Sequence, residues 1–456
     1  MQANGGARDS PDLQPPPGVV ELREDVPLKA GAVASEAGRW CAGGPRFVLG
    51  CFAALTVAVT VVPHGSVSSG AAACSRAGAD ALKRGGRALD AAVAAALCLA
   101  VLDPHRTSLD ASGALLYWEY GQVRAQGATP EAVEWGGPGA TAMRAPRLLA
   151  ALAALHAGRG ALPWADLLQP AIRLARGGFP VSEGLAVASA AEAAGGGAAS
   201  PLAPGTIDTA PLLADYLESL QHNTSAELSS AWSSEGVLVR STGVALDAGA
   251  WRLVAAGAGA ALAGRALAAA LQPPPSTVED ASERVIGALQ REAAAAAWTP
   301  TGVATGLAVV DQHDTYVALV TGLSRPFGSG ALQSGGWRAD APVAPLDLAP
   351  AIMVQQQVCG TRYVLGAESA AALAQGAAVL AVEGPLGAGA VERPRIALAP
   401  GGALLVEALR PTLAPASAAA GANASLPYAA VNVVRQQSDA LLSHADSRGG
   451  GLAYRF

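Results

Sequence analysis

The fold is decided by residues 303–330, V-A-T-G-L-A-V-V-D-Q-H-D-T-Y-V-A-L-V-T-G-L-S-R-P-F-G-S-G. Two apolar runs, residues 307–310 and 316–320, flank the short polar segment 311–314. β-branched and aliphatic residues favour strands, and a tight polar turn between two such runs predicts a β-hairpin. Because neither run carries a charge, we expect both strands of this hairpin to lie in the core.

The composition describes a large globular protein without a nucleic-acid partner. Its 456 residues are 51% hydrophobic and 14% charged, which is enough for one large or two ordinary domains with a sizeable core. The net charge is −6, and no stripe of Lys and Arg follows the chain, so we expect no nucleic-acid binding.

Cysteine and histidine spacing predicts no metal site and no cofactor. The five cysteines form no C-x-x-C pair, and the six histidines are dispersed. We expect at most one disulfide among Cys74, Cys98 and Cys359, with isolated buried thiols as the alternative.

The N-terminal region divides into a tail and an apolar segment. Residues 1–46 hold Pro15-Pro16-Pro17, mixed charges and no apolar period, which is typical of a solvated tail. Residues 47–62, F-V-L-G-C-F-A-A-L-T-V-A-V-T-V-V, carry no charge and would span ~24 Å as a helix, slightly less than the ~30 Å hydrocarbon core of a bilayer. We predict a transmembrane signal-anchor here, with a buried core segment as the alternative.

The flanking charges predict the orientation of that anchor. Lys29, Arg39 and Arg46 precede the segment, whereas the next basic residue is Arg76. The positive-inside rule then makes this a single-pass type II membrane protein, with residues 1–46 in the cytoplasm and the body 63–456 outside or in a lumen. Two sequons, which begin at Asn223 and Asn423, fit glycosylation on that side.

Four sequence blocks resemble one enzyme family. Residues 88–101 predict a buried core helix, and the longer segment 85–105, G-G-R-A-L-D-A-A-V-A-A-A-L-C-L-A-V-L-D-P-H, is similar to the gamma-glutamyltransferase (gamma-glutamyl transpeptidase) hallmark G-G-N-A-x-D-A-A-V-A-A-x-x-x-x-x-V-x-x-P-H. Residues 160–179 resemble the family's G-x-x-P-x-x-x-x-x-x-P-A-x-x-x-A-x-x-G-F. F-G-S-G at 327–330 and A-D-S-R-G-G-G at 445–451 complete the set in family order. The chain most resembles the short, divergent, membrane-anchored type-6 and type-7 branch.

The resemblance implies both a fold and a reaction. The fold is α+β, a four-layer αββα sandwich like that of the N-terminal-nucleophile hydrolases, here behind the predicted transmembrane segment. The precursor cuts itself and exposes a threonine, whose α-amine has a pKa near ~8 and can act as the base for the hydroxyl beside it. The family reaction cleaves the gamma-glutamyl bond of extracellular glutathione and transfers the acyl group to water or to an acceptor amine.

The nucleophile position departs from the family. Its pattern T-T-H-x-S-V-V-D aligns with residues 304–311, so Ala304 takes the nucleophile's place and the processing point would fall at 303/304. Alanine has no hydroxyl, and we therefore expect neither cleavage nor acyl transfer there. A one-residue slip would make Thr305 the catalytic residue, although alternation along a strand would turn it to the other face.

The substrate-holding positions also differ. The family's clamping arginine aligns near Gln126, with Arg124 two residues away, and the T-L-N segment reads Gly322-Leu323-Ser324. Asp340 is the one carboxylate near the missing acidic loop, and the oxyanion turn G-S-P-G-G reads 366–370, where Glu368 would repel a developing oxyanion. The paired serines after R-P-L are replaced around Asp347, and we expect His105 to be structural. The resulting substrate-binding candidates are Arg124, Gln126, Ser324, Asp340 and Ser369.

Two hypotheses remain. In the first, the protein acts on glutathione or other gamma-glutamyl compounds from a repositioned site. In the second, which the residues favour, it is a catalytically inactive, membrane-anchored binding protein. Association with other family members stays open in either case.

Overall fold

The computed structural model describes residues 64–120, 129–139, 145–197, 200–299, 301–329, 331–357, 360–384, 388–399, 403–407 and 429–456. They belong to one compact unit, Pro63–Phe456. The predicted tail 1–46 and signal-anchor 47–62 lie outside the described residues. Within the described ranges, no helix is long and apolar enough to cross a membrane.

The predicted hairpin is confirmed as strands β9 (Val303–Val310) and β10 (Thr315–Leu323). The strands are antiparallel, and Val310 lies opposite Tyr316 at the turn. The Asp311 carboxylate fixes that turn, because its Oδ1 accepts hydrogen bonds from the backbone N–H of His313 at 2.8 Å and of Thr315 at 3.0 Å. All of β10 and all of β9 after its first residue are buried, as the charge-free sequence predicts.

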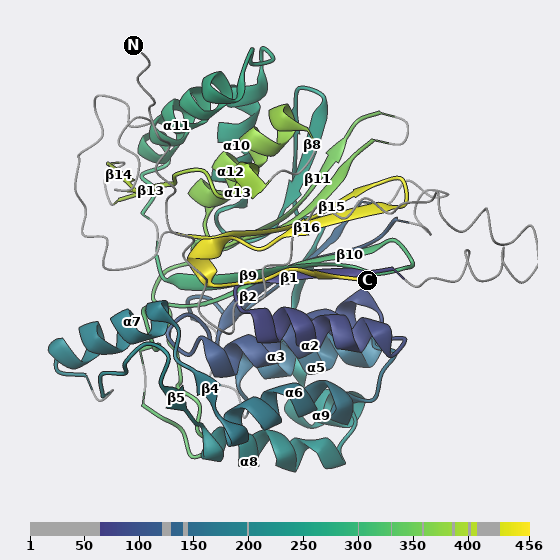
Figure 1. The fold of residues 1–456 in the computed structure, drawn as a ribbon, viewed down its shortest axis with the longest axis vertical. Coiled ribbons are helices and arrows are strands. Elements are labelled where there is room, and N and C mark those ends of the chain that lie inside the picture. The colour runs from purple at the N-terminus through teal and green to yellow at the C-terminus, as the bar shows by residue number, and fades with distance from the viewer. Residues whose placement is uncertain are drawn as a thin grey trace, which may run out of the picture. The chain divides into compact units, whose positions relative to one another are not determined.

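Two antiparallel sheets lie face to face (Figure 1). In the described residues the first sheet has the order β17 (Tyr454–Arg455), β1 (Ser66–Ser69), β9, β10, β2 (Ser112–Glu119), β3 (Glu131–Trp135), β6 (Val239–Ser241). The second has the order β16 (Ala440–His444), β15 (Val431–Gln437), β12 (Arg362–Ala367), β11 (Ala349–Gln355), β8 (Trp251–Ala255), β7 (Val244–Ala248). Two short pairs, β4 (Phe179–Pro180) with β5 (Ile207–Asp208) and β13 (Ile396–Leu398) with β14 (Leu404–Val406), stand apart.

The two sheets approach each other closely beside the start of β9. A Cβ added to Gly306 would lie 2.5 Å from the carbonyl oxygen of Gly366 on β12, so this contact requires glycine. The Asn432 side chain donates a 2.8 Å hydrogen bond to the Gly306 carbonyl and ties β15 to the same place. Apolar side chains such as Tyr316 and Ile352 fill the remaining space between the sheets.

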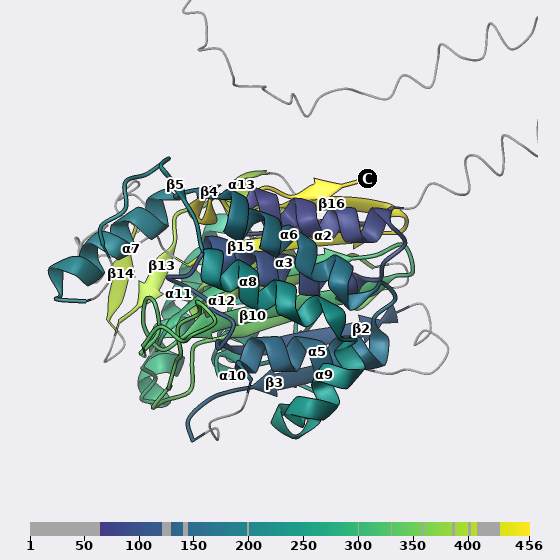
Figure 2. The same cartoon turned by 90° about the horizontal axis from the view of Figure 1, so that it is seen from below.

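Helices cover the outer face of each sheet (Figures 1 and 2). On the first sheet lie α2 (Ala72–Lys83), α3 (Ala88–Leu102) and α5 (Arg147–Arg159). The other helices on this side are α6 (Trp164–Gly177), α7 (Glu183–Ala194), α8 (Pro211–Ser219) and α9 (Ser225–Trp232), of which α6 packs on α3, α8 on α6 and α9 on α5. The second is covered by α10 (Ala260–Leu271), α11 (Val278–Ala295), α12 (Ala370–Glu383) and α13 (Ala388–Val391). Short 3₁₀ turns at Leu220–His222, Ser234–Val237 and Ser447–Gly449 complete the described elements. The predicted four-layer αββα sandwich is therefore confirmed.

Helix α3 is the central helix of the first layer. Residues from Ala88 to Val101 are all buried, which agrees with the predicted core helix over 88–101. A disulfide joins Cys98 on α3 to Cys74 on α2, at a sequence separation of 24. The structure thus forms one of the pairings that the sequence left open, while Cys359 lies outside the described residues.

Candidate functional site

A cavity of about 200 Å³ lies at the start of β9, where the sequence places the family's nucleophile. We call it the β9 pocket. Its walls come from segments far apart in the sequence, which include the turn after α3, the start of β9, the segment before β11 and the N-terminus of α12. It is lined by His105, Arg106, Thr301, Gly302, Val303, Ala304, Pro326, Asp347, Leu348, Glu368, Ser369, Ala371, Ala397, Leu398 and Ala429.

Ala304 lines this pocket, and Thr305 does not. Ala304 is 8% exposed, whereas Thr305 is fully buried and its Oγ1 has no hydrogen-bond partner among the described residues. A Cβ added to Gly70, which follows β1, would lie 3.2 Å from that Oγ1, so the hydroxyl points to another part of the core. Alternation along β9 therefore gives the pocket a methyl group at the nucleophile's position.

The turn 366–370, which the sequence aligns with the family's oxyanion turn, carries an ion pair. Nη1 of Arg106 donates to both carboxylate oxygens of Glu368 at 2.8 Å, and the backbone N–H of Ala430 donates to Glu368 Oε2 at 2.9 Å. Burial raises the pKa of Glu368, and Arg106 opposes that rise. Burial opposes the charge of Arg106, but the carboxylates of Glu368, Asp103 and Asp446 together outweigh it and raise the pKa of the guanidinium. Glu368 is thus bound by a cation that the sequence analysis did not select.

Two further titratable groups in the pocket were not chosen as candidates. His105 is 4% exposed, and neither of its ring nitrogens has a hydrogen-bond partner in the described part of the chain. Burial and the nearby Arg106 lower the pKa of His105 to about 3, so the ring is neutral at pH 7. Asp347 accepts one hydrogen bond at 2.9 Å, from the backbone N–H of Ala370, and burial raises its pKa to about 6.

Two predicted substrate-binding residues bind each other instead of lining the pocket. Asp340 accepts hydrogen bonds from the backbone N–H and the hydroxyl of Ser324, and from the backbone N–H of Ser329 at 3.1 Å. The backbone carbonyl of Asp340 also accepts from Arg147. Ser324 and Asp340 therefore hold the segment between β10 and β11 in place, and neither is among the residues around the pocket.

The remaining candidate residues for substrate binding and glycosylation lie in different places. Ser369 lines the pocket, but its hydroxyl oxygen also caps α12 by accepting from the backbone N–H of Ala372 at 3.1 Å. Arg124, Gln126 and Asn423 lie outside the described residues. Asn223 is exposed just before α9. These positions bring one predicted polar residue, Ser369, to the pocket.

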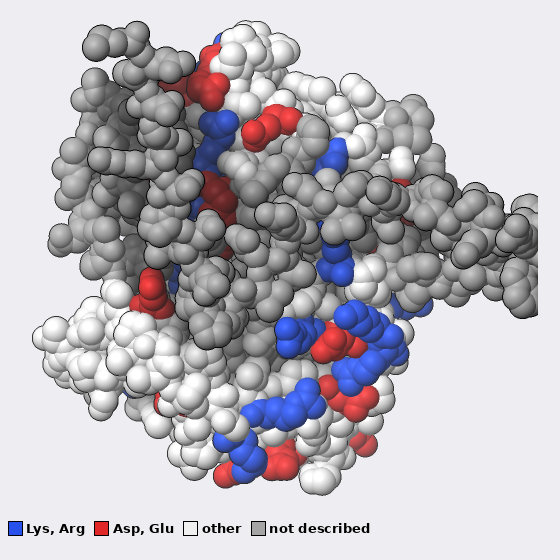
Figure 3. Space-filling view, viewed as in Figure 1, with Lys and Arg blue, Asp and Glu red and all other residues white. Residues whose placement is uncertain are grey.

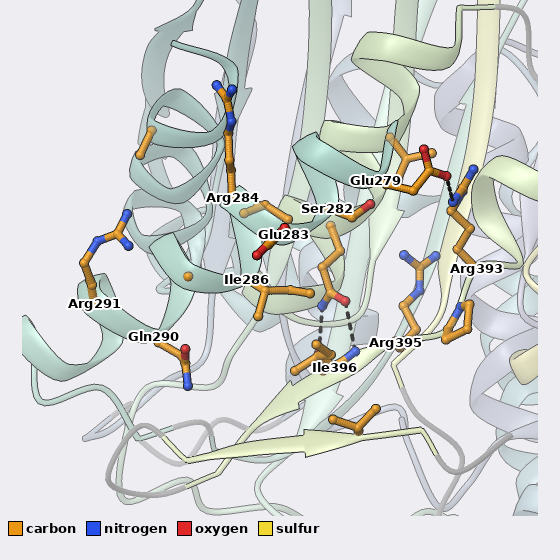
Figure 4. A pocket seen from close by; sticks show the side chains of 17 residues that line it. Glu279, Ser282, Glu283, Arg284, Ile286, Gln290, Arg291, Arg393, Arg395 and Ile396 are labelled. Atoms are coloured by element: carbon orange, nitrogen blue, oxygen red, sulfur yellow. Dashed lines mark hydrogen bonds and ion pairs between the residues drawn. The ribbon is translucent and has the colours of Figure 1, made fainter. Parts of the chain in front are cut away.

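Two other cavities are lined by charged side chains, some of which form ion pairs. The larger, about 610 Å³, lies between α11, α12 and the β13–β14 pair (Figure 4). There Arg393 contacts Glu279 at 3.3 Å, and Arg395 contacts Asp446, which does not line the cavity, at 3.3 Å. The other, about 570 Å³, lies under the Lys and Arg side chains that gather over α2 and α6 (Figure 3). Across the described residues, no three His, Cys, Asp or Glu side chains are grouped to hold a metal ion.

The comparisons with known proteins agree with the sequence blocks. Residues 74–227 match the family model described as Gamma-glutamyltranspeptidase. The chain is 31% identical over 297 residues to "Glutathione hydrolase 6" of Mus musculus, across 60% of this chain and 56% of that protein. It is 32% identical over 139 residues to "Glutathione hydrolase 7" of Bos taurus, across 28% of this chain and 21% of that protein. The chain thus matches 56% of the length of the first relative and 21% of the length of the second.

Among solved structures, cephalosporin acylase from Bacillus halodurans is similar over 86% of this chain and 96% of that chain. The TM-score is 0.68 at 17% sequence identity, so this likeness shows a shared fold and says nothing of a shared substrate. Motif blocks, family model and relatives agree: the chain is similar to the gamma-glutamyltranspeptidase family, including its type-6 and type-7 branch.

Proposed function

We propose that this protein is a catalytically silent gamma-glutamyltranspeptidase relative that uses the β9 pocket for binding. The observation that carries the proposal is that Ala304, not a hydroxyl-bearing residue, lines the pocket at the start of β9. Acyl transfer needs an oxygen within reach of the scissile carbonyl, and a methyl group cannot supply one.

The surroundings of Ala304 support the same conclusion. An oxyanion is stabilised by preorganised N–H donors aimed at the developing charge. In this pocket, Glu368 brings a buried carboxylate to the corresponding turn, and the Nη1 group of Arg106 is already bound to it. Both the nucleophile and the charge-stabilising donors of the family reaction are therefore replaced.

We propose further that the body is held outside the cell or in a lumen by the segment 47–62, as a single-pass type II protein. The Cys74–Cys98 disulfide supports an oxidising compartment, because disulfides are rare in the cytosol. The sequons at Asn223 and Asn423 support glycosylation there. Deleting 47–62 should release the body into the medium, and Asn223→Gln should remove one glycan-dependent shift on a gel; continued membrane association of the deletion variant would count against the anchor.

The decisive experiment combines a denaturing gel with an activity assay on the full-length protein. We expect a single uncut chain and no release of the chromogenic amine from a gamma-glutamyl anilide. Two fragments split before residue 304 or 305, together with amine release, would overturn the silent assignment.

The second candidate function is glutathione hydrolysis through Thr305, which the names of the relatives favour. It requires β9 to shift by one residue, since Thr305 is fully buried away from the pocket. Thr305→Ala tests it directly: if the wild type is active and this variant is not, the shifted nucleophile is correct.

A further inference from the structure

The charges that line the β9 pocket do not cancel. Among the described lining residues, the charged side chains are Arg106, Glu368 and Asp347. Arg106 and Glu368 form a 2.8 Å pair, so their charges offset each other. Asp347 makes no ion pair with any described residue, and its side chain receives one described hydrogen bond, from the backbone N–H of Ala370. When Asp347 is ionised, the pocket therefore holds one negative charge without a counter-ion.

Asp347 is placed to act on a bound molecule. It is 7% exposed and lines the pocket, so the small part of its surface that is accessible faces the cavity. One oxygen, Oδ1, is occupied by Ala370, and the other has no described partner. An ionised carboxylate that is buried with one hydrogen-bond donor destabilises the folded state. A cation that binds to it there would interact more strongly than with a carboxylate at the surface, because the effective dielectric constant is lower.

His105 supplies a second unused acceptor in the same pocket. Its two ring nitrogens are buried and without partners, and in a neutral imidazole one nitrogen is an acceptor in either tautomer. An ammonium group has three N–H donors and no acceptor, which matches a carboxylate and a neutral ring nitrogen. A carboxylate ligand would match poorly, because it would face Asp347 and because Nη1 of Arg106 is bound to Glu368.

The size of the pocket limits the ligand. About 200 Å³ corresponds to roughly six water volumes, enough for an amine on a short carbon chain. Apolar walls from Ala304, Leu348 and Leu398 suit such a chain. A divalent metal fits less well, since the described residues contain no three-residue metal group.

We propose that the β9 pocket binds a small primary ammonium compound, with Asp347 as its counter-ion and His105 as a second acceptor. The inference rests on the proposed function, because a pocket without a nucleophile can hold such a ligand without consuming it.

The test is calorimetric titration of the full-length protein with three probes of equal size: n-propylammonium, propionate and n-propanol. We expect n-propylammonium to bind about tenfold or more tightly than either other probe, since a hydrogen bond to a charged group is worth about 1 order of magnitude in affinity. Asp347→Asn should remove that preference. The amide keeps the size of the side chain and can still accept from the Ala370 N–H, so the variant is expected to fold. Asp247→Asn, at an exposed carboxylate on β7 that does not line the pocket, is the matched control and should bind as the wild type does.

His105→Phe provides a second, independent variant, because it fills the space without offering a nitrogen, and it should weaken n-propylammonium binding. Equal binding of propionate, or unchanged n-propylammonium affinity in Asp347→Asn, would overturn the inference. The gel and anilide assay on the same preparation separates the two proposals. If the chain is uncut and inactive but does not bind n-propylammonium, the ligand proposal is wrong and the silent function stands. If the chain is cut and active, the silent function is wrong, whichever probe binds.

Discussion

Asp90 and Asp347 are both buried aspartates, one at the start of α3 and one in the β9 pocket, yet their surroundings have opposite effects. Asp90 accepts hydrogen bonds from the backbone N–H groups of Arg87 at 2.7 Å and Ala161 at 3.0 Å, and it lies 3.1 Å from His156 Nε2. Burial opposes its charge, but His156 and these N–H groups outweigh burial and lower the pKa of Asp90. Asp347 has a single donor, and burial raises its pKa to about 6.

This difference in hydrogen-bond donors distinguishes a residue that stabilises the fold, Asp90, from one that faces the β9 pocket, Asp347. Asp90 belongs to the G-G-R-A-L-D block, and its donors come from α3 itself and from the start of the 160–179 block. Two family blocks are thus joined by one carboxylate. Asp347 lies in the segment that the sequence alignment gives to the family's paired serines, and no ion pair in the described fold neutralises it. A carboxylate that the fold surrounds with N–H donors stabilises the folded state. A carboxylate that faces a cavity with few donors is available to a ligand.

The largest effect expected is from Asp90→Ala. Removal of this carboxylate leaves several buried N–H groups without an acceptor, so the free energy of unfolding should fall by about 3–5 kcal/mol. Denaturant unfolding at pH 7 measures it, with the 57%-exposed Asp80 on α2 as the matched Asp→Ala control. Because the pKa of Asp90 is lowered in the folded state, its contribution is present above pH 4 and should be lost as the pH falls below that. A loss no larger than in the control would refute the structural role.

The next effect concerns the disulfide in the same helical layer. The double variant Cys74→Ala, Cys98→Ala should lose about 3 kcal/mol, because the cross-link closes a loop of about 24 residues in the unfolded chain. Thermal unfolding with and without reductant checks it. Reductant should lower the melting temperature of the wild type but leave the double variant unchanged; equal sensitivity in both proteins would mean that this bond is not the one being reduced.

Asp347→Asn should change stability in the opposite direction from Asp90→Ala. The pKa of Asp347 is raised from 3.8 to about 6, so the folded state favours the neutral form. The wild type therefore loses stability as the pH rises from about 4 to above 6, and the neutral amide avoids that loss. At pH 7.5 the variant should be more stable by about 2–3 kcal/mol, from 1.36 kcal/mol per pKa unit.

Unfolding curves of both proteins at pH 4 and pH 7.5 measure the difference. The two should be similarly stable at pH 4 and diverge at pH 7.5. Parallel pH dependence would show that Asp347 is already neutralised by something in the native protein.

The sequence predicted the elements better than the contacts between them. The hairpin at 303–323 and the helix at 88–102 followed from apolar runs bounded by turn residues, because those patterns are local. Arg106 and Glu368 are 262 residues apart, and no spacing rule joins such positions. One signal was available: Glu368 places a charge in the turn 366–370, where the aligned family pattern G-S-P-G-G has none. The Ser324–Asp340 pair shows the converse, since two residues chosen as ligand contacts satisfy each other.

The smallest change in stability is expected for a substitution at Thr305. This substitution tests the face of β9 that points away from the pocket. Thr305→Val replaces a buried hydroxyl without a partner by a methyl group, in a strand where β-branched residues fit well. Stability should stay the same or rise by up to about 1 kcal/mol, because no hydrogen bond is lost.

The control lies directly opposite on β10. Thr321 pairs with Thr305 in the sheet, but its hydroxyl donates to the Ser112 carbonyl at 3.1 Å. Thr321→Val should therefore lose about 1 kcal/mol, since it leaves a buried acceptor unpaired. Any release of the amine from a gamma-glutamyl anilide should be the same in wild type and Thr305→Val. Loss of that activity in Thr305→Val alone would mean that the hydroxyl leaves the core during the reaction, and the pocket's methyl group at Ala304 would no longer argue for a silent protein.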